Sequence, residues 1–231
     1  MEYLADGLAA ALHLLLHLDD ATRAAIAATL LSTGYAMTAA MLLGLPVGFA
    51  LGYASFPGKR ALRLLSDTLL AFPTVLIGLL VYAFITYRGP LGEWGLLFTL
   101  PGMAIGQAVL ALPIVVSWTA QAVESLDPRC RETLLTLGAR PLQVARLTLW
   151  ECRYAIGMVC VTAFGRVITE VGIAMMLGGN IRYATRTMTT AIALETSKGE
   201  FAQGIALGLV LLLMAFAVNL LLAFFRRRGR A

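Results

Sequence analysis

The sequence predicts an all-α protein, a polytopic membrane helix bundle of about five transmembrane helices preceded by an interfacial helix. Its 231 residues are 59% hydrophobic and 13% charged, with a mean hydropathy of +0.82, whereas a soluble domain carries about 25% charged residues. Four windows contain no charged residue, and each is long enough for a helix to cross the hydrocarbon layer. They are residues 24–58, 68–87, 94–123 and 201–225, and a fifth apolar stretch at 154–181 contains only two charged residues.

These windows define the predicted elements in chain order. The spans are expected at residues 24–52, 66–87, 94–120, 154–178 and 201–225. Together they form a transmembrane domain over residues 23–225, with a cytoplasmic loop at about 124–153. A basic cytoplasmic tail follows at 226–231.

Residues 1–22 are interpreted as an amphipathic helix that lies at the membrane interface. The run has no preceding Lys or Arg and no small-residue cleavage site, which argues against a cleaved signal peptide. His13 and His17 lie four residues apart, but no third ligand is near them, so a polar helix face is favoured over a metal site. The apolar side of the helix consists of Leu4, Leu8, Leu12 and Leu15.

The distribution of basic residues predicts the orientation. With the carboxyl terminus in the cytoplasm, twelve Lys and Arg residues lie on the cytoplasmic side and five on the opposite side, which satisfies the positive-inside rule. We therefore expect a multi-pass protein of the plasma (inner) membrane with its amino terminus outside. The net charge of +5 follows from this topology, and no nucleic-acid partner is expected.

Glycines at four-residue spacing predict close packing of the spans, because small residues let helix backbones approach each other in lipid. The spacing occurs at Gly44, Gly48 and Gly52, at Gly102 and Gly106, and at Gly204 and Gly208. Prolines inside the apolar windows are expected to kink or interrupt helices. They are Pro46, Pro73, Pro101 and Pro113.

The loop at 124–153 predicts two short helices that present a folded surface to a partner protein. Asp127 and Pro128 favour a helix start, as N-cap and first-turn residue. Gly138 can end this helix and Pro141 can begin the next.

Residues 178–201 are too polar to span a membrane, yet they include the charge-free piece 187–194. Irregular backbone at membrane depth must line a cavity or be covered by protein. A re-entrant segment is favoured, with a surface loop as the alternative.

Arg166 and Glu170 are the only charges in the fourth predicted span. Four residues apart on a helix, they share a face and can pair. Either charge alone near mid-membrane costs at least ~2.5 kcal/mol on insertion scales. Two interpretations stay open: a buried pair that fixes helix packing, or an Arg166 exposed to a substrate pathway while Glu170 limits the strength of binding.

The loop resembles the coupling loop of ATP-binding-cassette (ABC) importer permeases, whose hallmark reads Glu-Ala-Ala, three residues, Gly, nine residues, Ile-x-Leu-Pro. In ETLLTLGAR, Glu132 is followed at the required distance by Gly138. Thr133 and Leu134 replace the two alanines, and Thr-Leu-Trp-Glu replaces the final motif.

The second half of the chain resembles the oxyanion branch of the same family. The resemblance rests on FGRVITEVG at 164–172, GGNI at 178–181 and a threonine-rich run, as in molybdate and sulfate permeases. The stretch AIALETSKGEF at 191–201 is most similar to tungstate permeases.

The resemblance implies the MetI-like fold of ABC importer permeases and a homodimer of this chain. Each copy would dock one cytoplasmic ABC ATPase subunit, and an extracytoplasmic oxyanion-binding protein would deliver tungstate or, as second choice, molybdate. ATP and magnesium would be bound by the ATPase, because this chain has no GxxxxGK[ST] loop. We expect neither an enzyme nor a cofactor on this chain. The expected coupling residues are Glu132, Thr133, Leu134, Gly138, Ala139 and Arg140.

A dianion needs hydrogen-bond donors along its path rather than a deep charged well, since a tight site would trap it. The candidate pathway residues are Arg166, Glu170, Asn180, Arg182, Thr185, Arg186, Thr187, Thr189 and Thr190. The alternative is that the threonines cap turns and the outer arginines are solvated.

The competing function is a secondary transporter or channel for a small anion that works without an ATPase. Such proteins usually carry several intramembrane acids or an inverted repeat, but the sequence shows Glu170 as one such acid and no repeat. A membrane-embedded enzyme comes third, because no metal-ligand pair or nucleophile–base set supports it.

Overall fold

The computed structural model describes residues 19–228, and its regular elements are all helices, as predicted. The long helices are α2 (Asp20–Tyr53), α5 (Leu100–Glu124) and α11 (Phe201–Arg228). The shorter ones are α3 (Lys59–Leu70), α4 (Thr74–Ile85), the 3-10 helix η1 (Gly92–Trp94), α6 (Pro128–Thr136), α7 (Pro141–Glu151), α8 (Arg153–Ile168), α9 (Gly172–Gly178) and α10 (Met188–Ser197).

The two ends of the chain carry predictions that lie outside the described residues. These are the interfacial helix as far as residue 18, with His13 and His17, and residues 229–231 of the basic tail. α2 begins directly after Asp19, whose side chain accepts a hydrogen bond from the backbone nitrogen of Thr22 at 3.1 Å.

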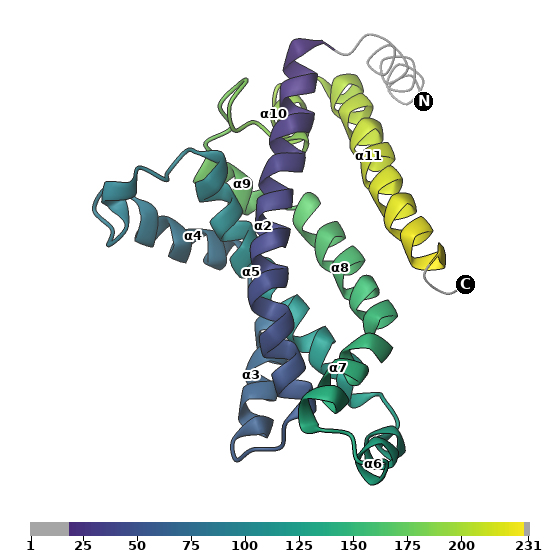
Figure 1. The fold of residues 1–231 in the computed structure, drawn as a ribbon. Coiled ribbons are helices and arrows are strands. Elements are labelled where there is room, and N and C mark those ends of the chain that lie inside the picture. The colour runs from purple at the N-terminus through teal and green to yellow at the C-terminus, as the bar shows by residue number, and fades with distance from the viewer. Residues whose placement is uncertain (1–18, 229–231) are drawn as a thin grey trace.

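α2 and α5 form the centre of the bundle and run in parallel (Figure 1). Three glycines of α2 face α5 where the two backbones lie closest. A Cβ atom on Gly48 would lie 2.6 Å from the carbonyl oxygen of Val116, and one on Gly52 would lie 2.6 Å from that of Ala120. The predicted glycine packing is confirmed for this pair, whereas a Cβ atom on Gly208 would meet nothing within 4 Å.

Two apolar clusters hold the outer elements against this centre. α9 inserts between α4 and α5, and Gly106 makes room for it, since its Cβ atom would come within 2.4 Å of the Leu177 side chain. The residues buried here are Ile77, Val81, Ile85, Met103, Leu110, Ile173, Ala174 and Leu177. α10 packs on α11, and Ala25 of α2 completes that second cluster.

The second predicted span, residues 66–87, is not one helix. α3 and α4 meet at residues 71–73 with a bend of 100°, and α4 points sideways from the bundle in Figure 1. Pro73 is the N-cap of α4, and its ring and missing N–H favour a helix start over a helix interior. Pro46 and Pro113, in contrast, lie within α2 and α5 without ending them.

The third and fourth predicted spans also differ in their limits. α5 covers Leu100–Glu124 rather than residues 94–120, and Pro101 stands in its first turn. In the fourth span, α8 ends at Ile168 and α9 begins at Gly172, so residues 154–178 are two helices with a break between them.

Three helices of the described part are long and apolar enough to cross a membrane: α2, α5 and the Phe201–Leu220 part of α11. The number rises to five if the bent pair α3–α4 and the pair α7–α8, bent by 55°, each count as one span. Several crossings, some of them broken, are therefore consistent with the described residues.

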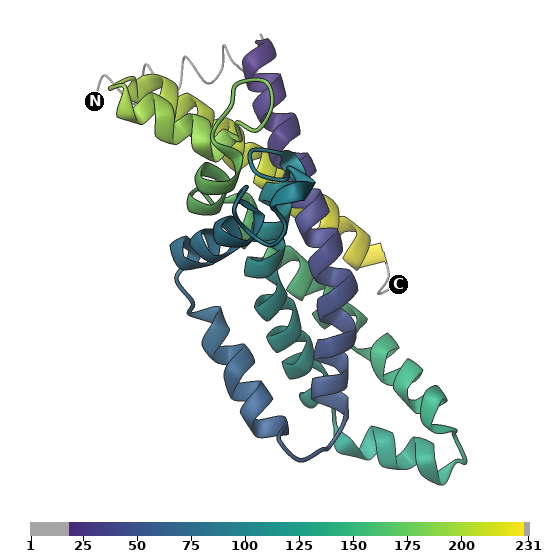
Figure 2. The same ribbon diagram turned by 90° about the vertical axis from the view of Figure 1, so that its left-hand side faces the viewer.

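Residues 179–187 form an irregular loop, and α10 follows it. The loop lies at the same end of the molecule as the start of α2 and the start of α11 (Figure 1). The α6–α7 pair lies at the other end, with α3 on the opposite side of α2 and α5 (Figure 2). The charge-free piece predicted at 187–194 is thus the first half of a helix that packs on α11.

Candidate functional site

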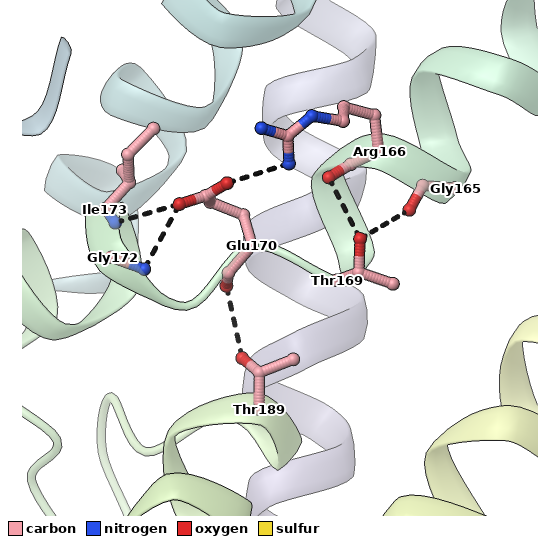
Figure 3. A network of polar contacts seen from close by, with 7 residues as sticks. All are labelled: Gly165, Arg166, Thr169, Glu170, Gly172, Ile173 and Thr189. Atoms are coloured by element: carbon pink, nitrogen blue, oxygen red, sulfur yellow. Dashed lines mark hydrogen bonds and ion pairs between the residues drawn. The ribbon is translucent and has the colours of Figure 1, made fainter. Parts of the chain in front are cut away.

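Arg166 and Glu170 form an ion pair with a distance of 2.9 Å between Nη1 and Oε2 (Figure 3). Arg166 stands in the last turn of α8, but Glu170 lies beyond the helix, in the break before α9. The prediction of a pair is confirmed, and the prediction that one helix face carries both residues is wrong, because α8 ends at Ile168.

Glu170 connects three elements. Its Oε1 accepts hydrogen bonds from the backbone nitrogens of Gly172 at 3.1 Å and Ile173 at 3.4 Å, at the start of α9. Its own carbonyl oxygen accepts a hydrogen bond from the Thr189 hydroxyl of α10 at 3.1 Å (Figure 3). The side chain is 5% exposed. The carboxylate therefore has partners on both oxygens and fixes the junction of α8, α9 and α10.

Arg166 differs from its partner in exposure. Its side chain is 43% exposed, and the bond to Glu170 is its single side-chain hydrogen bond within the described part of the chain. Thr169 is exposed beside it and donates its hydroxyl to the carbonyl oxygen of Gly165 at 2.9 Å. The guanidinium thus keeps N–H donors that no acceptor in the described part of the chain uses.

The candidate threonines are buried and bonded within the chain. The Thr187 hydroxyl accepts a hydrogen bond from the Thr190 nitrogen at 3.3 Å, and the Thr187 nitrogen donates to the Thr190 hydroxyl at 2.9 Å, which caps α10. Thr189 lies 2.9 Å from the Thr187 hydroxyl. Thr185 accepts from the Ile181 nitrogen at 3.1 Å. This arrangement favours the turn-capping interpretation of Thr185, Thr187 and Thr190, whereas the Thr189 hydroxyl joins α10 to Glu170.

The outer polar residues form a separate site. Arg186 donates from Nε to Oδ1 of Asn180 at 3.1 Å, and Asn180 holds a φ of 52°, the left-handed region that Asn tolerates. Arg182 lies 4.9 Å from the ring centre of Tyr183. A pocket of about 240 Å³ opens between α2, α10 and α11. Its charged lining residues are Asp19, Arg182, Arg186, Glu195 and Lys198.

The predicted coupling loop folds as two helices. The Asp127 side chain accepts a hydrogen bond from the Arg129 nitrogen at 2.9 Å and caps α6. Gly138 separates α6 from α7 with a φ of 81°, where no neighbouring atom would contact a Cβ. The predicted start and turn of this loop are confirmed.

The surface of this loop is largely uncovered. Leu137 is 78% exposed and Leu142 is 82% exposed, on either side of the turn. Among the predicted coupling residues, Leu134 and Ala139 are half-buried. The others are exposed: Glu132, Thr133, Gly138 and Arg140. Exposed leucines among polar residues are suited to contact with a partner protein.

A polar network between α3 and α5 was missed by sequence reasoning. Arg63 donates to the carbonyl oxygen of Ser117 at 2.8 Å and lies 3.5 Å from Asp67, whose carboxylate also accepts a hydrogen bond from the Ser117 hydroxyl. Lys59 pairs with Glu124 at 3.1 Å. The four-residue spacing of Lys59, Arg63 and Asp67 along α3 is the signal that could have predicted this inward polar face.

The chain is similar to known transport proteins. Residues 44–231 match the family described as binding-protein-dependent transport system inner membrane component. The chain is 46% identical to the tungstate uptake system permease protein of Campylobacter jejuni over 219 aligned residues. This alignment covers 95% of this chain and 92% of that protein. It is 37% identical to the tungstate uptake system permease protein of Peptoclostridium acidaminophilum, covering 95% of this chain and 96% of that protein.

Solved structures share the fold. The MetNI methionine ABC transporter in an inward-facing conformation matches with a TM-score of 0.65 and 17% identity, covering 88% of this chain and 92% of that chain. A bacterial alginate ABC transporter in complex with an alginate-bound periplasmic protein matches with a TM-score of 0.70 and 20% identity, covering 91% of this chain and 80% of that chain. These likenesses concern the fold, and they confirm the predicted fold class.

Proposed function

Because the chain belongs to the family of binding-protein-dependent transport system inner membrane components, we propose that it forms the pathway by which an ABC importer takes up tungstate. The chain is the membrane-spanning permease subunit of such an importer and an inner membrane component. The observation that carries the substrate is the 46% identity, over nearly the whole chain, to a tungstate uptake permease. The similarity to ABC permeases also argues against a transporter that works without an ATPase.

The complex we propose contains two copies of this chain, two cytoplasmic ATPase subunits and an extracytoplasmic binding protein for the anion. The ATPase binds ATP and magnesium and hydrolyses the ATP. Its docking site is the exposed surface of α6, the turn at Gly138 and the start of α7. The mixed-charge pocket with Arg182 and Arg186 lies at the opposite end of the molecule, where the binding protein would release the anion.

Arg166 is the cation we assign to the pathway itself. Its unused donors can attract a dianion, and Glu170 keeps part of its charge compensated at 2.9 Å. A half-compensated guanidinium binds the anion weakly enough to release it, as conduction requires. Glu170, in contrast, acts on the pathway by holding Arg166 and the start of α9 in place.

Gly138→Val and Glu132→Lys test the docking loop. Valine is strained at a φ of 81° by about 1 kcal/mol or more, and Glu132→Lys reverses a charge on the exposed face of α6. We expect both variants to reach the membrane in normal amounts but to lose most of the co-purifying ATPase and ATP-dependent uptake. Arg60→Gln, an exposed change on α3, is the control. Normal ATPase recovery in both loop variants would refute this docking site.

Introduced cysteines test the topology. Burial raises the pKa of the Cys152 thiol, so this native cysteine reacts poorly and exposed positions are needed. The side chains of Leu137 and Tyr87 are highly exposed, in loops expected on opposite sides of the membrane. A membrane-impermeant thiol reagent should therefore label Leu137→Cys in inverted vesicles only and Tyr87→Cys in intact cells only. The reverse pattern would invert the orientation proposed for the whole chain.

A further inference from the structure

A groove of about 950 Å³ lies between α7 and the ends of α2 and α8. This volume is at the upper end of the range of about 300–1,000 Å³ that ligand pockets occupy. Its walls are mainly apolar and include Leu45 of α2 and Ile156 of α8. Leu149 and Trp150 of α7 form the facing side. Nothing assigned above occupies this groove.

Two arginines stand at the groove. Arg146 of α7 is exposed and makes no hydrogen bond or ion pair within residues 19–228. Arg153 lies 4.6 Å from the Trp150 ring centre and 4.2 Å from the Tyr154 ring centre, and donates to the carbonyl oxygen of Trp150 at 2.7 Å. Among the described residues, no acidic side chain lines the groove. The groove therefore combines apolar walls with an uncompensated positive charge.

We expect the groove at the level of the membrane surface. Trp150, Arg153 and Tyr154 stand at the point where the polar loop gives way to the apolar α8. Aromatic and basic side chains concentrate at this depth in membrane proteins, where ring and stem lie against the acyl chains and the charge reaches the headgroups. Leu45 and Ile156 extend the apolar wall from this level into the bundle.

The docking surface for the ATPase meets this groove only in part, at the coupling residue Ala139. α6 lies farthest from the membrane helices, and α7 lies between α6 and α8 (Figure 1). A second hollow of about 450 Å³ on the α6 side of α7 contains the coupling residues Thr133 and Leu134. The larger groove opens toward α2 and α8 instead, so a water-soluble partner would have to enter the membrane surface to fill it.

We propose that this groove binds one anionic phospholipid. The phosphate lies against Arg146 and Arg153, and the acyl chains follow Leu45 and Ile156 into the bilayer. Basic pockets beside membrane helices are suited to acidic headgroups. The assignment to the cytoplasmic leaflet rests on the proposed topology, and the lipid site itself does not depend on tungstate being the substrate.

Native mass spectrometry of the purified permease–ATPase complex tests the proposal. Phosphatidylglycerol and phosphatidylcholine with the same acyl chains are titrated onto delipidated complex. We expect phosphatidylglycerol to bind at least fivefold more tightly, and Arg146→Gln to weaken it about fivefold, the effect of one basic residue near a membrane surface. Arg60→Gln removes an exposed arginine outside the groove and should change nothing. Ile156→Trp, which fills the apolar wall, should weaken both lipids.

Several results would overturn this assignment. Equal binding of the two lipids would show that the groove does not select an anionic headgroup. An equal loss of binding in Arg60→Gln would show diffuse attraction instead of a site. Glycerol phosphate bound as tightly as the intact lipid would indicate a site for a soluble phosphate. A photo-reactive residue at Leu149 should crosslink to lipid in membranes; crosslinking to the ATPase or to a second copy would show that protein covers the groove.

Discussion

Arg166→Met should abolish uptake and weaken assembly, and a second change, Glu170→Met, should restore part of the assembly but not the uptake. The single change leaves the Glu170 carboxylate, 5% exposed, without its cation. Breaking a buried pair by removing one partner costs about 3–5 kcal/mol, whereas removing both leaves no uncompensated charge. Assembly is measured by size-exclusion chromatography of the solubilised complex, and transport by anion uptake in vesicles.

The two residues of the pair are not equivalent, because Glu170 also accepts hydrogen bonds at the start of α9. Glu170→Met also removes the acceptor for the Gly172 and Ile173 nitrogens at the start of α9, so the double variant should recover part of the assembly rather than all of it. Arg60→Met is the control for lost charge, since Arg60 is exposed on α3 and is neither a pathway nor a coupling residue. Full recovery of uptake in the double variant would show that the pair is structural only, and would remove Arg166 from the pathway.

Gly48→Val should prevent α2 from packing on α5. Its Cβ atom would lie 2.6 Å from the Val116 carbonyl oxygen and 2.8 Å from the Thr119 Cβ atom, and neither backbone can yield without separating the helices. Overpacking of this kind costs about 1–3 kcal/mol or more. We expect a large loss of folded permease, measured as the thermal unfolding midpoint in detergent and as yield from membranes.

Gly34→Val is the matched control, because Gly34 lies on the same helix with nothing within 4 Å of a Cβ atom. It should retain nearly wild-type stability. If both valine variants were equally unstable, helix propensity rather than backbone contact would explain the loss at Gly48.

Much of the fold follows from local patterns in the sequence. Charge-free windows identify the apolar helices, and the Asp127, Pro128 and Gly138 signals identify the start and end of α6, because caps and turns depend on a few neighbouring residues. The glycine spacing likewise predicts close packing of the spans, which the contact between α2 and α5 confirms.

The bend angles and exact positions of the breaks within the predicted spans were not predicted from the sequence. Pro73 indicates an interruption, but the 100° turn of α4 depends on packing against α9, which lies about one hundred residues later in the chain. Hydropathy also gives no sign that α8 stops at Ile168, because the break at Glu170 is stabilised by hydrogen bonds from α9 and α10.

The candidate site was predicted only in part, again because some of its contacts join residues that are distant in the sequence. The pairing of Arg166 with Glu170 follows from the cost of an isolated charge in lipid. The roles of the threonines do not, since Thr187 and Thr189 become caps and bridges only once α10 lies beside the α8–α9 junction. Asp67 was overlooked because its partner Ser117 belongs to another helix.

Transport in reconstituted vesicles tests the central claim most directly. The permease and its cognate ATPase are placed in liposomes, with the binding protein and tungstate on the side opposite the ATPase and with ATP on the ATPase side. The account predicts tungstate accumulation that requires ATP and the binding protein and that Arg166→Met abolishes. Accumulation driven by an ion gradient without the ATPase, or ATP-dependent transport of an anion other than tungstate with no tungstate uptake, would contradict it.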